Sequence, residues 1–160
     1  MSLVTTVGYI RSDLESLREW CIQQSATEQT IVSSYAFGRT HKWFGYDVIL
    51  TQLPIITEGY HDYRVARLGD LLLPGWDCAL LCHYRPGTYM SAHCDHRVFE
   101  PRLLLVNVGY ATLRVDNQLH HLNDGQVISF DSNVEHELYP VPAERWSLIF
   151  RKIRSEYLPA

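Results

Sequence analysis

The chain lacks several features by which whole classes of protein are recognised. No apolar run approaches the length that crosses a bilayer, and the segment 1–6 has no basic stretch ahead of an apolar one. The four cysteines include no CxxC pair, which favours reduced thiols in a cytoplasmic protein over a disulfide framework. These absences predict a cytoplasmic protein with no membrane partner.

Positive charge is also scarce. The 14 Lys and Arg residues are outnumbered by 18 Asp and Glu residues, so the formal net charge is −4 at pH 7. Proteins that bind nucleic acids usually carry a basic face, because neutralising phosphates supplies much of their affinity. The composition therefore favours a protein or small-molecule substrate somewhat, although the cluster around Arg39 and Lys42 leaves a local basic patch open.

What is present is the composition of a globular domain. With 160 residues, 46% of them hydrophobic, the chain is long enough for one sizeable core, and it contains no repeat or linker. Ser12 and Glu15 form a capping box ahead of apolar residues at helical spacing, which predicts a helix over 13–24. A second, short helix is expected over 65–73. We therefore expect one domain spanning 1–160.

Short segments rich in β-branched and aromatic residues predict strands through the rest of the chain. We expect strands over 31–37, 43–53, 78–84, 102–108, 110–115, 126–130 and 145–153, with breaks at 86–87, 117, 123–125 and 140–142. Many short strands separated by regular turns indicate a jelly roll or barrel. The expected fold is mainly β (α+β): a lead-in over 1–35 whose helix packs on the sheet, and a jelly-roll core over 36–152.

The residues that carry chemistry lie in the second half. His93 and Asp95 are two positions apart, so in an extended segment their side chains share one face. With a distant His136 they match the two-His, one-carboxylate facial triad of non-haem Fe(II) oxygenases, which leaves the opposite coordination positions open. His-x-Asp alone is a weak pattern, so the context matters. Cys94, between the two, is expected to be a small buried residue pointing away from the metal.

The last predicted strand supplies that context. Its residues Arg145, Ser147, Ile149 and Arg151 share one parity within an apolar stretch, so two arginines are expected on one face of a strand that is not simply an exposed edge. Arginine is ordinarily solvated, which makes this arrangement costly for a merely structural strand. A planar cation at Arg145 suits the far carboxylate of an oxo-acid cosubstrate.

Longer motifs surround these residues. Tyr84-Arg85-Pro86-Gly87 precedes His93-x-Asp95, the apolar run 103–109 and the segment 122–130 follow, and the strand ends Arg145-x-Ser147-x-Ile149-x-Arg151. With these motifs the chain resembles the AlkB-like 2-oxoglutarate- and Fe(II)-dependent dioxygenases. The resemblance covers 36–152 and is most specific over 84–151. Cys82 and Ser147 depart from it, since asparagine is common in the family at both positions.

The resemblance implies a double-stranded β-helix that uses Fe(II), 2-oxoglutarate and O2. The implied metal ligands are His93, Asp95 and His136, and the implied cosubstrate residues are Tyr84, Arg145, Ser147 and Arg151. Arg145 would pair with the 5-carboxylate, and Arg151 would lie near the metal-proximal carboxylate. Such enzymes convert 2-oxoglutarate to succinate and CO2 while hydroxylating a C–H bond, and hydroxylation of an N-methyl group removes it as formaldehyde.

Three functions stay open from the sequence. The first, set slightly ahead, is an oxygenase acting on a nucleobase in nucleic acid or in a modified nucleotide, with Arg39, Trp43 and Tyr46 on the substrate side because aromatic rings stack on bases. The second uses the same mechanism on a protein side chain or small molecule. The third is a non-oxygenase metal-binding jelly roll of cupin type, which has no need of two inward-pointing arginines.

Overall fold

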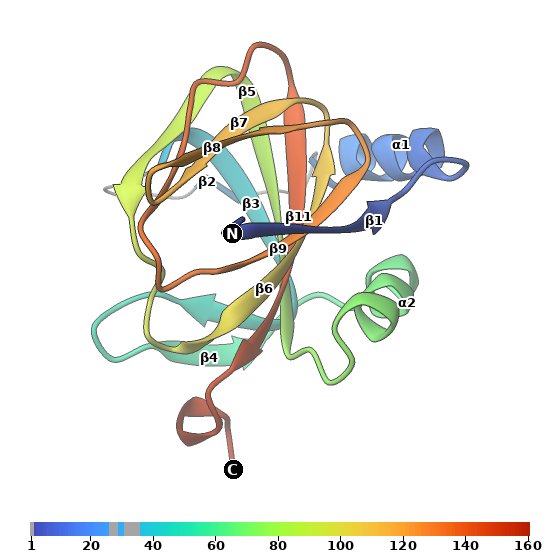
Figure 1. Ribbon diagram of the computed structural model, residues 1–160. Coiled ribbons are helices and arrows are strands. Elements are labelled where there is room, and N and C mark those ends of the chain that lie inside the picture. The colour runs from blue at the N-terminus through green and yellow to red at the C-terminus, as the bar shows by residue number, and fades with distance from the viewer. Residues whose placement is uncertain (1, 26–28, 31–35) are drawn as a thin grey trace.

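The strands of the protein form one curled antiparallel sheet with two helices packed on its outside (Figure 1). This computed structural model describes residues 2–25, 29–30 and 36–160. In chain order the elements are β1 (Val4–Tyr9), α1 (Leu14–Ser25), β2 (Gln29–Thr30), β3 (Ala36–Ile49), β4 (Ile55–Glu58), α2 (Tyr63–Leu72), β5 (Cys78–His93), β6 (Phe99–Val108), β7 (Ala111–Val115), β8 (Gln118–Leu122), β9 (Gln126–Asp131), β10 (His136–Leu138), β11 (Arg145–Ile153) and a 3-10 turn at Ser155–Tyr157.

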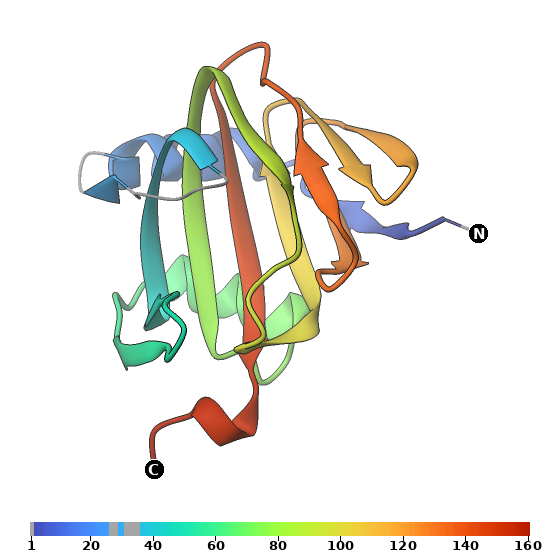
Figure 2. The same ribbon diagram turned by 90° about the vertical axis from the view of Figure 1, so that its left-hand side faces the viewer.

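The sheet follows the order β1-β9-β6-β11-β5-β10-β7-β8, and β3 adds to the free side of β5. The long strands β3, β5 and β11 therefore run side by side through the middle of the molecule (Figure 2). Side chains alternate between the two faces of each strand. On β11 this alternation sends Trp146, Leu148 and Phe150 into the core beneath the helices, while Arg145 and Arg151 point into a cavity on the concave face.

The two helices cover the convex face because each has one apolar side. Leu17, Trp20 and Cys21 of α1 are buried in the same cluster as Val65 of α2. Asp62 links the two helices. Its carboxylate caps α2 by accepting the backbone N–H groups of Arg64 and Val65, and it also accepts the indole N–H of Trp20 at 3.1 Å. The concave face is thereby left for the cavity.

The expected architecture is confirmed in its main features and wrong in several details. Both helices lie within two residues of their predicted ranges. The predicted break at 86–87 is wrong: β5 continues to His93, because Gly87 adopts a left-handed φ of 87° and its N–H donates to Val141 O at 2.8 Å. Strands β1, β4, β8 and β10 were not expected. The lead-in is therefore more than a helix, since β1 pairs with β9.

Two predicted strands coincide only in part with the elements of the structure. The strand predicted over 31–37 falls largely on 31–35, outside the described residues, and the one predicted over 43–53 is part of β3 and ends at Ile49. Among the described residues no helix is long and apolar enough to cross a membrane. The four cysteines are free thiols, as expected, but Cys94 is exposed and so is not the buried residue that was predicted. The cytoplasmic location and the single domain over 1–160 stay predictions.

Candidate active site

A cavity of about 830 Å³ occupies the concave face of the sheet. Its lining includes eight of the candidate site residues named from the sequence: Arg39, Trp43, Tyr84, His93, Asp95, His136, Arg145 and Arg151. Strand register explains this meeting. Tyr84 on β5 pairs with Arg145 on β11 and with Arg39 on β3, so these three side chains form one row at one end of the cavity.

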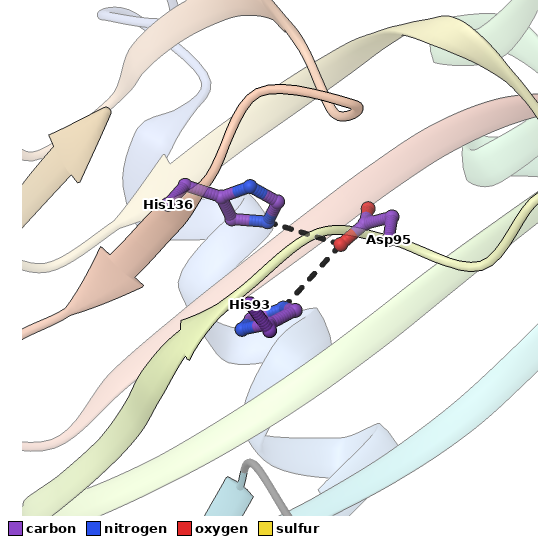
Figure 3. Close-up of side chains that lie close together, drawn as sticks. All are labelled: His93, Asp95 and His136. Atoms are coloured by element: carbon purple, nitrogen blue, oxygen red, sulfur yellow. Dashed lines mark ion pairs between the residues drawn. The ribbon is translucent and has the colours of Figure 1, made fainter. Parts of the chain in front are cut away.

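The other end of the cavity holds the proposed triad. His136 on β10 pairs with His93 at the end of β5, and Asp95 lies in the loop that follows (Figure 3). His136 Nε2 is 3.0 Å and His93 Nε2 is 3.4 Å from Asp95 Oδ1, and one potential ligand atom from each residue lies within 4.8 Å of the others. The two imidazoles and the carboxylate thus point at a common centre.

Hydrogen bonds at Nδ1 fix the orientation of the two histidine rings. His93 Nδ1 lies 2.7 Å from Ser91 O, and His136 Nδ1 lies 2.8 Å from Val134 O. A carbonyl oxygen only accepts hydrogen bonds, so each Nδ1 must carry a proton as donor, and Nε2 is the ring nitrogen turned toward Asp95. A metal would bind Nε2 in its unprotonated form, in place of the proton that it donates to Asp95 in the metal-free protein. Metal-bound histidines are usually held in this way through their second nitrogen.

The charges at this end are mutually compensated. Arg151 Nη1 donates to Asp95 Oδ2 at 2.5 Å, and Arg151 Nη2 donates to Ser132 Oγ at 2.8 Å. Burial alone raises the pKa of Asp95, but hydrogen bonds from His136 and His93 and the charge of Arg151 hold it well below its usual range. For His136, burial lowers the pKa, but the hydrogen bond to Asp95 and the charge of Asp95 raise it by more, so the net shift is upward.

The far end contains charge without such compensation. Arg145 is 1% exposed, its Nε donates to Asn107 Oδ1 at 2.8 Å, and its guanidinium carbon lies 4.8 Å from the Tyr84 ring centroid. Burial lowers the pKa of Arg145. Ser147, one step along β11, is fully buried on the same face but does not line the cavity, and its hydroxyl has no hydrogen-bond partner among the described residues.

The residues expected on the substrate side are only partly brought together. Arg39 and Trp43 line the cavity, but Tyr46 does not and packs instead against the cluster around Trp43. Trp43 is 6% exposed, and its ring stacks on Phe99 with centroids 6.2 Å apart. Lys42 points to the helical side, where its Nζ donates to Gln24 Oε1 at 2.8 Å. This segment therefore offers less free aromatic and basic surface than its sequence indicates.

Sequence reasoning missed three residues that matter to this site. Asn107 orients Arg145, and the available signal was a lone polar residue in the apolar run 103–108. Ser132 supports Arg151, for which no sequence signal existed. Asp47 lines the cavity near its mouth on β3, and burial raises the pKa of its carboxyl group. Its carboxylate makes no hydrogen bond or ion pair with the described residues.

The donor set fits Fe(II) with 2-oxoglutarate. Two neutral imidazoles and one carboxylate oxygen are the ligands that non-haem Fe(II) oxygenases use, and they lie on one side of a common centre. A dicarboxylic oxo acid also fits, because the cavity has the buried Arg145 at the opposite end. A cupin-type site would not require these groups.

Comparisons with known proteins agree with this geometry. A family model described as aspartyl/asparaginyl β-hydroxylase matches residues 74–154, a range that contains the triad and both β11 arginines. No curated protein matches the sequence.

Solved structures share the fold at low identity. They include a prolyl-4-hydroxylase from Pseudomonas putida (17% identity, TM-score 0.67, covering 96% of this chain and 94% of that one) and OsALKBH1 (10%, 0.69, 95% and 99%). A Trichoplax adhaerens prolyl hydroxylase in complex with a peptide fragment of the hypoxia inducible factor oxygen degradation domain is also similar (14%, 0.64, 96% and 84%). The expected double-stranded β-helix is confirmed.

Proposed function

This chain belongs to the aspartyl/asparaginyl β-hydroxylase family and is a 2-oxoglutarate- and Fe(II)-dependent oxygenase, and we propose that it hydroxylates a side chain presented by a peptide. The observation that carries the site assignment is the convergence of His93, Asp95 and His136 at one end of a cavity whose other end contains the buried Arg145. We propose these three residues as the metal ligands and Arg145 as the anchor of the 5-carboxylate of 2-oxoglutarate.

Arg151, Tyr84 and Ser147 are proposed to support the metal ligands and the cosubstrate. Arg151 holds Asp95 through Oδ2, so that Oδ1 is the oxygen turned toward the metal centre. Tyr84 and Ser147 are proposed to donate hydrogen bonds to the cosubstrate. The bound metal and cosubstrate supply the oxidation of a C–H bond by O2, with 2-oxoglutarate converted to succinate and CO2. The chain's own contribution is to orient the ligands, neutralise the cosubstrate's charge and surround it with apolar walls.

The mouth of the cavity favours a peptide. The exposed lining residues Ile49, Leu50, Thr51 and Cys94 mark this opening, and the adjoining β3–β4 hairpin also exposes Leu53 and Ile55. Exposed apolar side chains beside a cavity suit contact with a peptide better than contact with phosphates. The three arginines that line the cavity, Arg39, Arg145 and Arg151, lie in its interior rows rather than at the mouth.

Asp47 indicates which kind of substrate side chain the cavity prefers. Its unpartnered, partly desolvated carboxylate gains a hydrogen bond from an N–H donor and repels a second carboxylate. A neutral carboxamide such as that of asparagine therefore suits the mouth better than an aspartate. The family description names both residue types, so we propose the asparaginyl side chain as the preferred substrate class.

The second candidate is the nucleobase oxygenase, for which oxidative demethylation is the expected reaction. It is supported by the AlkB-like motifs over 84–151, but the engaged rings of Trp43 and the helical-side placement of Lys42 give it less support than the peptide. The family that matches is a different one from the AlkB-like proteins, so AlkB-like specificity stays a hypothesis.

One assay separates these candidates. Full-length protein with Fe(II) and 2-oxoglutarate is offered asparagine-containing peptides, matched aspartate-containing peptides, free amino acids and methylated single-stranded oligonucleotides, and succinate, formaldehyde and the mass of each candidate substrate are measured. We expect substrate-dependent succinate and a gain of one oxygen atom on an asparaginyl peptide, abolished in the double variant H93A/D95A. Formaldehyde from the oligonucleotides alone would replace the peptide proposal with the nucleobase one. Full turnover by the double variant would refute the metal assignment.

A further inference from the structure

Two arginines at one end of the cavity form no ion pair with a carboxylate in the part of the chain that the structure describes. The cavity is lined by Arg39, Arg145 and Arg151 and by two aspartates. Asp95 pairs with Arg151, and Asp47 makes no ion pair in the described part of the chain. Arg39 and Arg145 likewise form no salt bridge with any described residue. Because a charge removed from water is costly unless it is paired, this surplus indicates an anionic ligand.

The two arginines converge on one point. They flank Tyr84 in the row that crosses β3, β5 and β11. Arg145 lies against the Tyr84 ring, with 4.8 Å between the guanidinium carbon and the ring centroid. On the other side, Arg39 Nη1 and Tyr84 Oη both donate to Met90 Sδ, at 3.3 and 3.6 Å. Two guanidinium groups and a phenol therefore surround a single small volume.

The backbone is shaped to bring Arg39 there. The pairing of β3 with β5 shifts by three residues between Phe37 and Arg39, because Gly38 alone, at φ 78°, spans the gap on β3 while residues 85–88 span it on β5. Regular pairing would place Arg39 opposite Gly87, so the extra residues of β5 bring Tyr84 opposite Arg39 instead. Arg39 Nε is buried without a hydrogen-bond partner among the described residues. A buried donor left unpaired at a bulge is typical of a ligand-binding position.

We propose that Arg39 is a second arm of the cosubstrate site, binding the 5-carboxylate of 2-oxoglutarate together with Arg145 and Tyr84. The inference rests on the proposed function, since it concerns the same cosubstrate. It gives Arg39 a role different from the substrate contact expected from the sequence. A carboxylate held from two sides is selected strongly over a neutral group, so the site should discriminate dicarboxylic from monocarboxylic oxo acids.

The test is direct binding to the full chain loaded with Mn(II), measured by calorimetry without substrate. The ligands are 2-oxoglutarate and 2-oxopentanoate, the same oxo acid without its far carboxylate. The variant is Arg39→Met, and the matched control is Arg102→Met, which alters an exposed arginine on β6 of the same sheet. We expect Arg39→Met to weaken 2-oxoglutarate roughly 10- to 100-fold, leave 2-oxopentanoate unchanged, and thus lower the selectivity by the same factor. The control should alter neither.

Each other outcome counts against the inference. Equal weakening of both ligands means that Arg39 only supports the fold. Unchanged 2-oxoglutarate binding with a raised KM for the substrate assigns Arg39 to the substrate instead. If Arg39→Met does not fold, Arg39→Lys is measured in its place, and an ammonium that keeps full selectivity overturns the two-armed geometry. Failure of the parent protein to bind 2-oxoglutarate at all refutes the proposed function. If Arg39→Met binds 2-oxoglutarate as tightly as the parent, this inference alone is refuted.

Discussion

The two ends of the cavity differ in how their charges are balanced. At the metal end, Asp95 accepts from Arg151 and from the two histidines, and Ser132 accepts from Arg151 Nη2, although Arg151 Nε has no hydrogen-bond partner among the described residues. At the anion end, Arg39 and Arg145 flank Tyr84, and neither forms a salt bridge with a described residue. The charges at the metal end are paired, and the anion end carries surplus positive charge.

This difference separates positioning from binding. A network of paired charges keeps ligand atoms in place before the metal binds, and removing one charged member leaves another buried and unpaired. An unsatisfied end gains free energy only when its ligand binds, so it favours binding at the expense of the free protein's stability. Substitutions at the two ends are therefore expected to act on different quantities: stability and metal binding at the first, cosubstrate affinity at the second.

The largest effect is expected from Asp95→Ala. Removing this carboxylate abolishes metal binding and turnover, and it also leaves Arg151 buried without its partner, which destabilises the protein by roughly 3–5 kcal/mol. His93→Ala is the informative companion, because it removes a ligand while keeping the Asp95–Arg151 pair. Urea denaturation of the metal-free proteins measures the difference. Equal stability of the two variants would show that the buried Asp95–Arg151 pair does not contribute to folding as proposed.

At the anion end the next largest effect is expected from Arg145→Ala. Truncating a desolvated partner of a carboxylate typically costs roughly 2–5 kcal/mol, or about 30- to several-thousand-fold in affinity. Calorimetry with 2-oxoglutarate on the Mn(II)-loaded protein measures the loss, and Arg145→Lys should recover only part of it because an ammonium lacks the planar fork. Binding of 2-oxoglutarate by Arg145→Ala at parental strength would remove Arg145 from the site.

The metal end was predictable from the sequence because its signal is local. The proposed ligands His93 and Asp95 are two positions apart and so stay close although β5 ends at His93, and the parity of β11 places Arg145 and Arg151 on one side. The helices were predictable for the same reason, since capping and periodicity act within a few residues. The third proposed ligand, His136, was identified by its residue type.

The anion end was less predictable because it depends on strand register. Arg39 lies opposite Tyr84 only because the pairing of β3 with β5 shifts at residues 85–88, and nothing in the local sequence specifies which residue of β5 lies opposite. The same limitation explains the break wrongly predicted at 86–87. Pro86 and Gly87 are typical turn residues, yet the backbone contact between Gly87 and Val141 keeps β5 continuous.

A smaller effect concerns Cys78, which pairs with Arg151 below the metal end. Burial raises the pKa of its thiol to about 12, well above the ordinary value for cysteine. The folded state therefore holds this proton more tightly than the unfolded state. This contribution to stability is complete below pH 9 and is lost as the pH rises toward 12. We expect the urea midpoint to fall over that window, and less so in Cys78→Ala. A parallel decline in both proteins would assign the loss to other groups.

The smallest effect on stability is expected from substituting two serines, one near each end of the cavity, that differ in their hydrogen bonding. Ser132 Oγ accepts from Arg151 Nη2 and donates to Pro101 O at 3.0 Å, whereas Ser147 Oγ is buried without a partner in the described structure. Removing a satisfied hydroxyl costs roughly 1–3 kcal/mol when its partner stays buried, but removing an unsatisfied one costs little or stabilises. Ser132→Ala should therefore lower the urea midpoint of the ligand-free protein, and Ser147→Ala should leave it unchanged or raise it.

Cosubstrate affinity should respond in the opposite sense. A neutral hydrogen bond to a ligand is worth roughly 0.5–1.5 kcal/mol, so Ser147→Ala is expected to weaken 2-oxoglutarate about 2- to 12-fold. Ser132→Ala should have little direct effect, because Ser132 contacts Arg151 rather than the anion end. Since Ser147 does not line the cavity, this is a demanding test of its assignment. If Ser147→Ala binds 2-oxoglutarate as the parent does, its hydroxyl is a buried polar group without a ligand, and the unsatisfied end of the cavity reduces to Arg39, Tyr84 and Arg145.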